Sequence, residues 1–504
     1  MMRWTEEQQA IIESTGHLIR TDAYAGTGKT STLDGWARAH SDQRILYLAF
    51  NRSVREEAKR RFPSHVTSVT THAVAGPMLR RYQHKLAKSL RPYQIMREMG
   101  LDWIPYRERV FYAKLLIETL RAYFISTADT ITAELVTTVM PLGAGVLRHV
   151  GTDAVARDAQ KLWDRMRDPN DRAIGMPHDG YLKLFVLDQP RLPYDTVLFD
   201  EAQDANPITL QLMALQSHAR QIFVGDPHQA IYGFRGAVNA MEALDADETY
   251  RLTGSFRFGS AIAGVGTRLL RWRDDTLPPL RGLNGDPDEL RSAGGMPMPV
   301  TMITRTNAQL FAEAVSVMNA LPDAKLAFIG GIDSYRFELI EDVYGLWAQK
   351  PETVRDPFVR LFDTFDELEQ YAADAEDKEL GIRCRLVKQW QHSIPVYIKQ
   401  LRAAAGPLED AQVAFATAHK SKGLEFPNVR LGRDFADLVA DAQTWTAYQN
   451  APPGPARDDL EAQLLRQEEL NIWYVAATRA QRRLYLPSPE VHQLLAVHPA
   501  AVAH

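Results

Sequence analysis

The fold is decided by one short stretch, Ala23-Tyr24-Ala25-Gly26-Thr27-Gly28-Lys29-Thr30. An alternating apolar and polar segment, residues 18–21, precedes it, and a helical pattern over residues 31–39 follows it. A glycine-rich turn between a strand and a helix is the context of a phosphate-binding P-loop, because the turn and the start of the helix both direct backbone N–H groups at an anion. The stretch therefore predicts a binding site for a nucleoside triphosphate.

The residue types in this loop have separate tasks. Gly26 and Gly28 let the backbone curl inward. Lys29 adds a point charge for the β- and γ-phosphates, and the hydroxyl of Thr30 is placed to bind Mg²⁺. The generic pattern has glycine at the position of Ala23. Because alanine disfavours positive φ, we expect an ordinary backbone conformation there.

Composition places the chain among globular proteins. Its 504 residues, 45% hydrophobic and 24% charged, are enough for several domains. The single cysteine, Cys384, excludes an intramolecular disulfide and a cysteine-rich zinc site, and we expect its thiol to be buried. The N-terminus lacks an apolar signal core and no apolar run has membrane length. We therefore expect a cytoplasmic protein, of bacterial origin, with no membrane partner.

The net charge of −5 does not by itself suggest a nucleic-acid-binding protein. Positive charge is nevertheless concentrated between residues 51 and 91, where only Glu56 and Glu57 oppose it. The basic residues of this segment are Arg52, Arg55, Lys59, Arg60, Arg61, Arg80, Arg81, Lys85, Lys88 and Arg91. Such a cluster favours contact with a phosphate backbone, although a solvated helix face stays an equal alternative for each residue alone.

The remaining pattern alternates between sheet-like and helical regions. Strand-like segments occur at residues 44–49, 65–70, 194–199, 221–224, 299–303, 325–329, 413–416 and 483–486. Between them, residues 77–191 show helical periodicity with no parallel-strand signal, and residues 333–406 are mostly helical and rich in charge. Residues 451–455 form a proline-rich loop or linker.

An acidic pair, Asp200-Glu201, follows the apolar segment 194–199. In a chain with a P-loop, one carboxylate of such a pair holds Mg²⁺ and the other polarises the attacking water. Hydrolysis also requires positive charge at the γ-phosphate, commonly from an arginine of a neighbouring domain. Arg257 and Arg479 are the candidates, although by composition alone a surface arginine is the more frequent explanation of either.

These motifs occur in a fixed order along almost the whole chain. The ordered set comprises Gln8 and residues 26–30, 48–51, 70–72, 200–204, 225–237, 255–257, 417–425 and 474–480. With this order the chain resembles the UvrD/Rep-like superfamily 1A DNA helicases. Residues 178–184, 238–240 and 255–259 are similar to the helicase portion of the F-box DNA helicases.

The resemblance implies an ATP site that uses Mg²⁺. Gln8 would read the adenine edge, Phe256 would stack on the base, and Glu425 would approach the ribose. The nucleotide-binding set would be Gln8, Gly26, Thr27, Gly28, Lys29, Thr30, Phe256 and Glu425, with Thr30 and Asp200 as metal ligands. The catalytic set would be Lys29, Glu201, Gln229, Arg257 and Arg479, with Glu201 as the base, Gln229 as a γ-phosphate sensor and the arginines as fingers.

The resemblance also implies a path for single-stranded DNA. The contacting residues would be Phe50, Asn51, Thr70, His72, Tyr232, Phe234, Arg235 and His419. Aromatic rings stack on any base, and basic or hydroxyl groups bind phosphates, so this set suits binding without sequence preference. Phe234 stands where the family commonly has tryptophan, which predicts weaker stacking.

The expected fold is α/β, with two RecA-like P-loop NTPase lobes built on parallel sheets flanked by helices. The expected boundaries are 1–76 and 192–249 for the first lobe, 77–191 for its helical insertion, 250–332 and 407–504 for the second lobe, and 333–406 for a reduced second insertion. ATP would lie in the cleft between the lobes, and closure of the cleft would shift one lobe along the strand.

Three functions stay open. The leading one is an ATP-dependent 3′→5′ DNA helicase of repair or recombination that acts on single strands and on junctions with duplex. The second is a translocase that strips recombinase filaments with little unwinding, which the short second insertion favours. The third is a DNA-sensing NTPase of defence that acts with a separate nuclease.

Overall fold

The computed structural model describes residues 3–49, 51–87, 89–139, 150–233, 236, 239, 241, 244–292, 295, 297–374 and 377–496, without the side chains of residues 106, 107 and 378. The chain forms two compact units. The first comprises Met1–Ala23 and Gly28–Leu252, and the second comprises Tyr24–Thr27 and Thr253–His504. The tip of the glycine-rich loop therefore belongs to the second unit.

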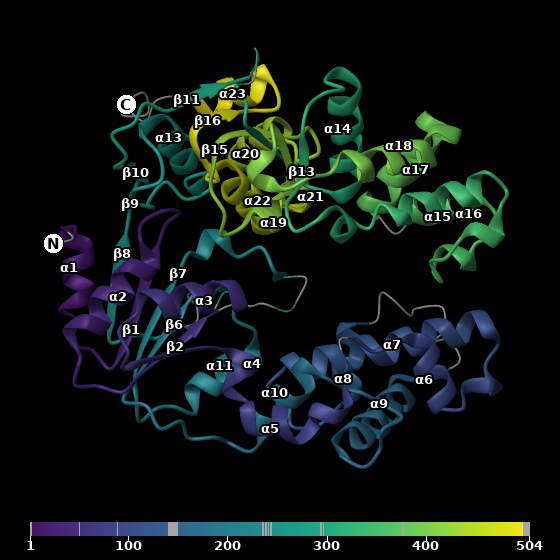
Figure 1. Ribbon diagram of the computed structural model, residues 1–504, viewed down its shortest axis with the longest axis horizontal. Coiled ribbons are helices and arrows are strands. Elements are labelled where there is room, and N and C mark those ends of the chain that lie inside the picture. Colours follow the sequence, from purple (N-terminus) through teal and green to yellow (C-terminus); the bar gives the residue numbers. More distant parts are fainter. Residues whose placement is uncertain are drawn as a thin grey trace. The chain divides into compact units, whose positions relative to one another are not determined.

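A six-stranded parallel sheet forms the centre of the first unit, in the order β3-β2-β6-β7-β1-β8 (Figure 1). Its strands are β1 (Leu18–Ala23), β2 (Ile45–Ala49), β3 (Val66–Thr70), β6 (Thr196–Asp200), β7 (Arg220–Gly225) and β8 (Glu248–Leu252). Its helices are α1 (Glu6–Ile12), α2 (Lys29–Ala39), α3 (Arg52–Arg61), α4 (Thr71–Val74) and α11 (Pro207–Ala214). Every residue of β2 and β6 is buried, as expected for parallel strands covered on both faces.

A helical region connects β3 to β6 in this unit. Its helices are α5 (Gly76–Tyr82), α6 (Pro92–Glu98), α7 (Tyr106–Ile125), α8 (Ala133–Thr138), α9 (Thr152–Arg167) and α10 (His178–Leu187). Tyr123, Phe124 and Trp163 pack against one another in its core. The expectation of no parallel strands here is wrong in one detail, because Leu86–Ala87 (β4) pairs in parallel with Met176–Pro177 (β5). Two residues per strand are too few to leave a periodic signal.

A buried lysine joins two of these helices. Lys183 of α10 is 0% exposed, and its Nζ donates hydrogen bonds to the carbonyls of Ser126 (2.8 Å) and Ala128 (2.6 Å), just beyond the end of α7. The same Nζ lies 4.6 Å from the centre of the Tyr123 ring. Burial lowers the pKa of Lys183 to about 8. The ammonium therefore completes the end of α7 at a desolvation cost.

This cost predicts a pH-dependent contribution to stability. The pKa of Lys183 falls from 10.5 to about 8 on folding, so between these values the unfolded chain holds a proton that the folded chain has released. Stability from this group therefore rises as pH increases from about 8 towards 10.5, and is lost as pH falls through about 8. We expect the urea midpoint of the wild type minus that of Lys183→Met to increase between pH 7.5 and 9.5. Lys161→Met, at an exposed lysine of α9, is the control, and a constant gap between wild type and Lys183→Met would contradict the assignment.

The second unit contains another six-stranded parallel sheet, in the order β11-β16-β15-β12-β14-β13 (Figure 1). Its strands are β11 (Glu289–Arg291), β12 (Val300–Thr304), β13 (Leu326–Phe328), β14 (Val413–Thr417), β15 (Phe426–Leu431) and β16 (Ala480–Tyr485), and a small pair is formed by β9 (Gly254–Ser255) and β10 (Arg281–Gly282). The helices beside the sheet are α13 (Ser260–Leu270), α14 (Asn307–Ala320), α19 (Ala418–Ser421), α22 (Gln467–Ala477) and α23 (Pro489–Ala496). Two parallel sheets flanked by helices confirm the predicted α/β class.

A second group of helices connects β13 to β14. They are α15 (Glu338–Trp347), α16 (Phe365–Asp374), α17 (Lys378–Trp390) and α18 (Ile394–Ala404). Cys384 of α17 is buried at 1% exposure, as expected, and burial raises the pKa of its thiol to about 11. The domain boundaries given above stay a prediction.

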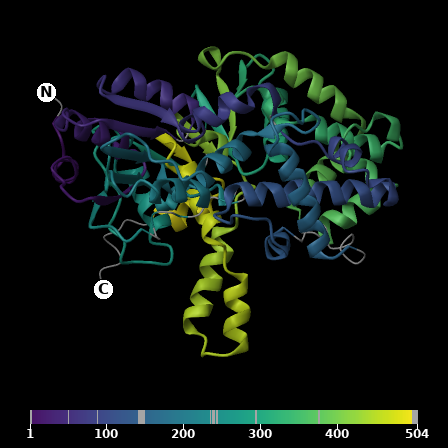
Figure 2. The same ribbon diagram turned by 90° about the horizontal axis from the view of Figure 1, so that it is seen from below.

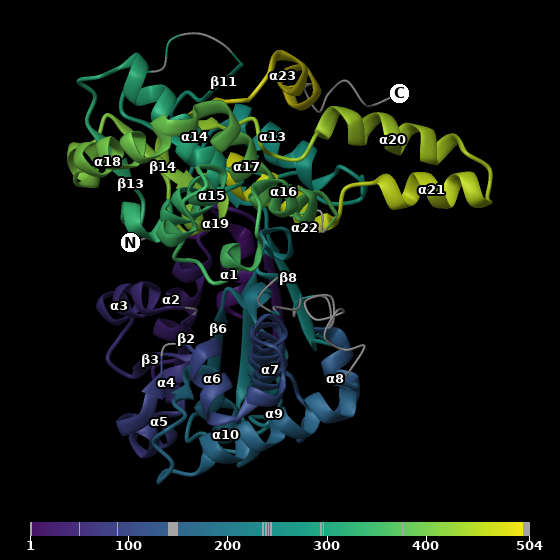
Figure 3. The ribbon, with the colours of Figure 1, turned by 90° about the vertical axis from the view of Figure 1, so that its right-hand side faces the viewer.

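A helical hairpin that the sequence did not predict follows β15. Its helices, α20 (Leu438–Asn450) and α21 (Pro455–Gln463), run side by side and project from the second unit, with the proline-rich loop at their tip (Figures 2 and 3). Asp441 fixes the base, because its buried carboxylate accepts hydrogen bonds from Trp272 Nε1 (2.7 Å), Arg273 Nη2 (2.9 Å) and the Leu465 N–H (2.6 Å). The hairpin is thus a firmly anchored arm.

Among the described residues, no helix is both long enough and apolar enough to cross a membrane.

Candidate nucleotide and strand site

The parallel order of the first sheet gathers the candidate residues at one edge. Carboxyl ends of parallel strands meet at the same edge of a sheet, where α/β proteins bind ligands. The segments at this edge are the glycine-rich loop after β1, Asn51 after β2, Thr70 at the end of β3 with His72 beyond it, Asp200-Glu201 at β6, and residues 226–229 after β7. The topology therefore brings together residues that lie up to two hundred positions apart in the chain.

The glycine-rich loop has the backbone that phosphate binding needs. Gly26 and Gly28 take φ of +74° and +79°, whereas Ala23 ends β1 in the ordinary conformation that we expected. Helix α2 starts at Lys29 with Gly28 as its N-cap. Because glycine has no side chain, Gly28 does not cap the first turn, and the N–H groups of this turn point to where an anion would bind. The Nζ of Lys29 donates to the Ala23 carbonyl (3.3 Å), across the base of the loop.

The two expected metal ligands lie in direct contact. Thr30 Oγ1 donates a hydrogen bond to Asp200 Oδ2 (2.9 Å), and Tyr47 OH donates to the same oxygen (2.7 Å). Asp200 is 2% exposed, and burial together with the Glu201 carboxylate raises its pKa, against the opposing charge of Lys29. Burial and the charge of Asp200 also raise the pKa of Tyr47. A cation at this point would relieve a carboxylate that is buried close to another one.

These residues fit a nucleotide with its magnesium ion. Among the described residues no group of three or more His, Cys, Asp or Glu side chains could hold a metal alone. A Thr–Asp pair beside a P-loop suits Mg²⁺ instead, because that ion takes one or two protein oxygens together with phosphate oxygens and water. The hydroxyl of Thr30 and the carboxylate of Asp200 would supply those protein oxygens.

A chain of buried hydrogen bonds connects the expected base with the expected γ-phosphate sensor. Gln203 Nε2 donates to Glu201 Oε2 (2.5 Å), and Gln203 Oε1 accepts from the Asp226 N–H (2.9 Å). Asp226 Oδ2 in turn accepts from Gln229 Nε2 (2.6 Å). Gln203 and Asp226 are both 0% exposed, and Glu201 takes a φ of +53°, which is uncommon for a residue other than glycine. Glu201 and Gln229 are therefore joined through two fully buried residues, Gln203 and Asp226.

Within the second unit, the tip of the glycine-rich loop packs against both arginine motifs. The Ala25 N–H donates to Tyr474 OH (3.0 Å), and the Phe256 N–H donates to the Gly26 carbonyl (2.9 Å). A Cβ at Gly26 would lie 2.4 Å from Ser255 Oγ, so only glycine fits there. The two arginine motifs, residues 255–258 and 474–480, both contribute to this packing.

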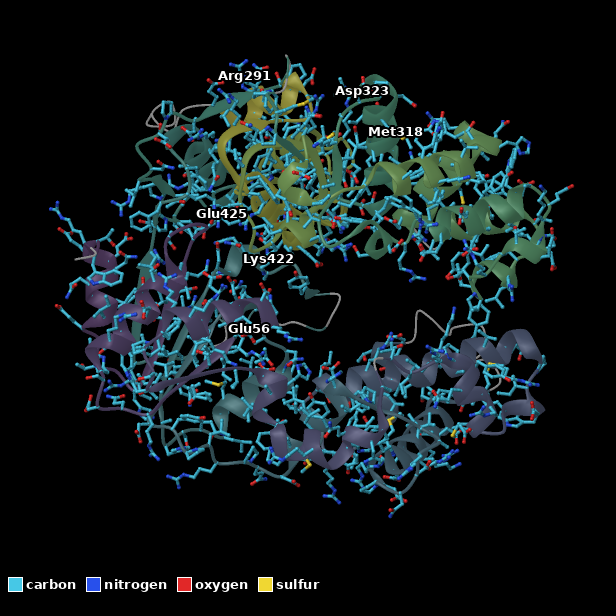
Figure 4. The ribbon with its side chains drawn as sticks, viewed as in Figure 1. Glu56, Arg291, Met318, Asp323, Lys422 and Glu425 are labelled. Atoms are coloured by element: carbon cyan, nitrogen blue, oxygen red, sulfur yellow. The ribbon has the colours of Figure 1, made fainter. Side chains whose placement is uncertain are left out.

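Arg257 is held by an ion pair within its unit. Its Nη2 lies 2.7 Å from Glu425 Oε1, and its Nη1 donates to the Thr478 carbonyl (2.8 Å). Its Nε has no hydrogen-bond partner among the described residues. Burial raises the pKa of Glu425, but the charge and hydrogen bond of Arg257, the hydrogen bond from Gln481 and the charge of Arg479 together outweigh it, so the pKa lies below its usual value. Glu425 stands in the segment before β15 (Figure 4).

Arg479 is more deeply placed. Its side chain is 1% exposed, and it donates to the carbonyls of Val475 (2.9 Å) and Leu424 (3.3 Å) and to Thr478 Oγ1 (3.2 Å). Direct contact of Arg479 with a phosphate would therefore require an exchange of these bonds. In the second sheet Glu425 and Arg479 precede β15 and β16, and so lie at the amino edge, whereas His419 follows β14 at the carboxyl edge.

The two residues expected at the adenine differ in exposure. Phe256 is 48% exposed, which leaves its ring free to stack on a base. Gln8 is 3% exposed and takes part in a capping box at the start of α1: its Oε1 accepts from the Thr5 N–H (3.1 Å), and its own N–H donates to Thr5 Oγ1 (3.2 Å). Thr5 is thus the N-cap of α1.

Several residues that are expected to contact single-stranded DNA also have structural roles. Asn51 Oδ1 caps α3 by accepting from the Val54 N–H (2.9 Å), and Thr70 Oγ1 caps α4 by accepting from the Ala73 N–H (3.3 Å). His72 contacts Asp179. Tyr232 and His419 are partly exposed. Phe50, Phe234 and Arg235 lie outside the described residues, as does Lys88 of the basic cluster.

Sequence reasoning missed four residues of this site. Tyr47 resembles an ordinary apolar residue of a buried strand, and nothing in its position indicates a bond to Asp200. Gln203 and Asp226 lie inside motifs that were recognised, but their spacing does not show that they meet. Tyr474 is the first residue of the second arginine motif, but nothing in the sequence indicates that its hydroxyl accepts a hydrogen bond from the Ala25 N–H.

The fold and this loop place the chain among proteins that bind nucleotides through a P-loop. The UvrD/REP helicase N-terminal domain matches residues 181–249, and the UvrD-like helicase C-terminal domain matches residues 341–490. The chain thus carries an N-terminal and a C-terminal domain of the UvrD-like helicase kind, which confirms the predicted resemblance, and such domains imply the two RecA-like lobes that we expected.

Two relatives match nearly the whole chain. F-box DNA helicase 1 of Gallus gallus is 31% identical over 521 residues, which cover 98% of this chain and 50% of that protein. F-box DNA helicase protein 1 of Schizosaccharomyces pombe is 31% identical over 526 residues, which cover 96% and 57%. RecBCD enzyme subunit RecB of Mycobacterium tuberculosis is 38% identical over 95 residues, 18% of this chain and 8% of that protein.

The chain thus spans about half the length of the F-box relatives. The predicted similarity to the helicase portion of the F-box DNA helicases is confirmed. The two long matches are to eukaryotic proteins, so the expected bacterial origin has no support from them.

Proposed function

We propose that this protein is an ATP-dependent DNA helicase or translocase that moves 3′→5′ on single-stranded DNA, in repair or recombination. The family and the names of the two long relatives support a DNA helicase. The 3′→5′ direction and the role in repair or recombination are proposed from the resemblance of the motifs.

One observation carries the proposal. One edge of a single sheet carries both groups of residues. Thr30 and Asp200 of the nucleotide site lie there, and so do Thr70 and His72, which are expected to contact the DNA strand. A translocating motor must couple its nucleotide site to its DNA-binding site. When both sites lie on one sheet, a change at the phosphates can alter the contacts with the DNA strand. The hydrogen-bonded chain from Glu201 to Gln229 is a physical route for such coupling, because it continues along the backbone towards Tyr232.

In this proposal each residue of the nucleotide site has a defined task. The loop N–H groups and Lys29 bind the phosphates, and Glu201 accepts a proton from the attacking water. Magnesium, bound beside Thr30 and Asp200, supplies charge neutralisation at the phosphates. Arg257 and Arg479 would contribute positive charge from the second lobe, for which each must leave its present partners.

The test measures ATP hydrolysis with and without single-stranded oligodeoxythymidylate, and strand displacement on duplexes with a 3′ or a 5′ single-stranded tail. We expect hydrolysis to rise at least tenfold with the oligonucleotide, and displacement only from the 3′ tail. Displacement from the 5′ tail alone would refute the polarity, and hydrolysis that ignores DNA would refute the motor.

Two further arms separate the alternatives. Removal of a recombinase filament without duplex unwinding would favour the stripping translocase, which the limited extent of α15–α18 supports. Hydrolysis stimulated by DNA without any movement would favour a sensing NTPase that depends on a separate nuclease.

A further inference from the structure

The motif at residues 178–184 has no part in the nucleotide site, but it lies beside His72, which is expected to contact the DNA strand. It opens α10, and α10 packs against α4, the short helix that carries His72. The helical region and the sheet of the first unit therefore meet at this point.

A charge-assisted hydrogen bond joins the two helices. His72 Nε2 lies 2.8 Å from Asp179 Oδ1. The side chains are 40% and 49% exposed, so solvent or a strand can reach both. The hydrogen bond from His72 lowers the pKa of Asp179, assisted by the charges of His178 and Arg121. The carboxylate is therefore ionised at neutral pH and can only accept.

This bond fixes which ring nitrogen His72 can offer to a ligand. Because an ionised carboxylate accepts and cannot donate, Nε2 must carry a hydrogen. The other nitrogen, Nδ1, has no hydrogen-bond partner among the described residues. Nδ1 is then the atom available to a strand, as a donor to phosphate when the ring is charged and as an acceptor when it is neutral.

The rest of the motif holds Asp179 in place. A Cβ at Gly180 would lie 2.7 Å from Met176 Sδ, so the turn of α10 approaches β5 closely. Tyr181 is 2% exposed, and its ring meets the His72 ring edge-on at 6.2 Å between centroids. Lys183 ties the same helix to the end of α7. Asp179 is thus mounted on a helix that is fixed on several sides.

We propose that Asp179 is a positioning residue for the strand site, and that it acts by holding the His72 ring with Nδ1 offered to single-stranded DNA. The inference rests on the proposed function and extends it to a residue outside the known motifs of the sheet. It makes a prediction opposite in sign to simple electrostatics. Loss of a negative charge near phosphates would strengthen DNA binding, whereas loss of the positioning bond would weaken it.

The experiment measures the concentration of oligodeoxythymidylate that gives half-maximal stimulation of ATP hydrolysis. We expect Asp179→Asn to raise this concentration about tenfold, the effect of losing one charge-assisted hydrogen bond, and to change the rate at saturating DNA less than twofold. Asp179→Glu, which keeps the charge, should recover part of the loss. The matched control is Asp188→Asn, which removes an exposed carboxylate at the other end of α10 and should leave the concentration unchanged.

A double-mutant cycle tests the route through His72. In a His72→Ala background, Asp179→Asn should have no further effect, because the group it positions is gone. Thermal unfolding of each variant verifies the fold. Among the described residues, the side chain of the half-exposed Asp179 is hydrogen-bonded only to His72, so we expect no loss of folding.

The outcomes distinguish a failure of the positioning role of Asp179 from a failure of the proposed function. If the wild type is stimulated by DNA and Asp179→Asn shows an unchanged or lower half-saturating concentration, the positioning role is overturned and the motor stands. Additive effects of the two substitutions would likewise overturn it. If the wild type is not stimulated at all, the proposed function fails, and the inference fails with it.

Discussion

Lys29→Ala is expected to reduce ATP hydrolysis by about 10²–10³-fold or more, with and without DNA. Lys29 begins α2 immediately after Gly28, and its Nζ spans the loop to the Ala23 carbonyl. It is therefore a cation placed where the loop would hold phosphates. Steady-state phosphate release measures the effect directly.

Lys161→Ala is the matched control, because Lys161 is an exposed lysine of α9 whose ion pair within the described part of the chain is with Asp158, at 2.9 Å. Its hydrolysis rate should equal that of the wild type. Substantial DNA-stimulated turnover in Lys29→Ala would refute the assignment of residues 23–30 to the phosphates.

Arg257→Ala should lower DNA-stimulated hydrolysis about 10³-fold while ATP binding changes little. Arg257 borders the loop tip, since its Cβ would lie 2.7 Å from a Cβ placed on Gly26, and its Nε is unpaired among the described residues. A guanidinium in this position can stabilise charge that develops during phosphoryl transfer. Arg257→Lys should remain slow, because a lysine cannot reproduce the planar, forked donor geometry.

The measurement is single-turnover hydrolysis together with the affinity for a fluorescent ATP analogue. Arg291→Ala is the control: Arg291 lies on β11, pairs with Glu289, and stands well apart from Glu425 in Figure 4. A rate within twofold of the wild type in Arg257→Ala would remove this residue from the catalytic set.

The parts of the fold that follow from local pattern were predictable from the sequence. Strand β2 is apolar throughout, and β6 and β7 contain apolar runs at residues 197–199 and 222–224. The glycines of the loop at residues 23–30 predict its backbone conformation. Strand β8 was missed because Glu248–Leu252 alternates charged and polar residues with few apolar ones. The β4–β5 pair was missed because it is only two residues long.

The parts that depend on tertiary contact were not predictable. The sequence indicated that Thr30 and Asp200 belong to one site, because each sits in a recognisable motif. It could not show that Tyr47 shares the same carboxylate oxygen, since a tyrosine in a buried strand has the same pattern as a phenylalanine. The bond between His72 and Asp179 is similar: 107 residues separate the partners, and only packing of α10 on α4 brings them together.

The hairpin of α20 and α21 offers a place to attach a reporter. The chain's only thiol, Cys384, is buried and has a pKa raised to about 11, so it reacts poorly with maleimides at neutral pH. A thiol introduced by Ala456→Cys, at an exposed position near the hairpin tip, would then be modified selectively. Since Asp441 fixes the base of the arm, a dye placed there would report on the second unit as a whole, and single-molecule fluorescence could test the proposed movement along DNA with a label outside the nucleotide site.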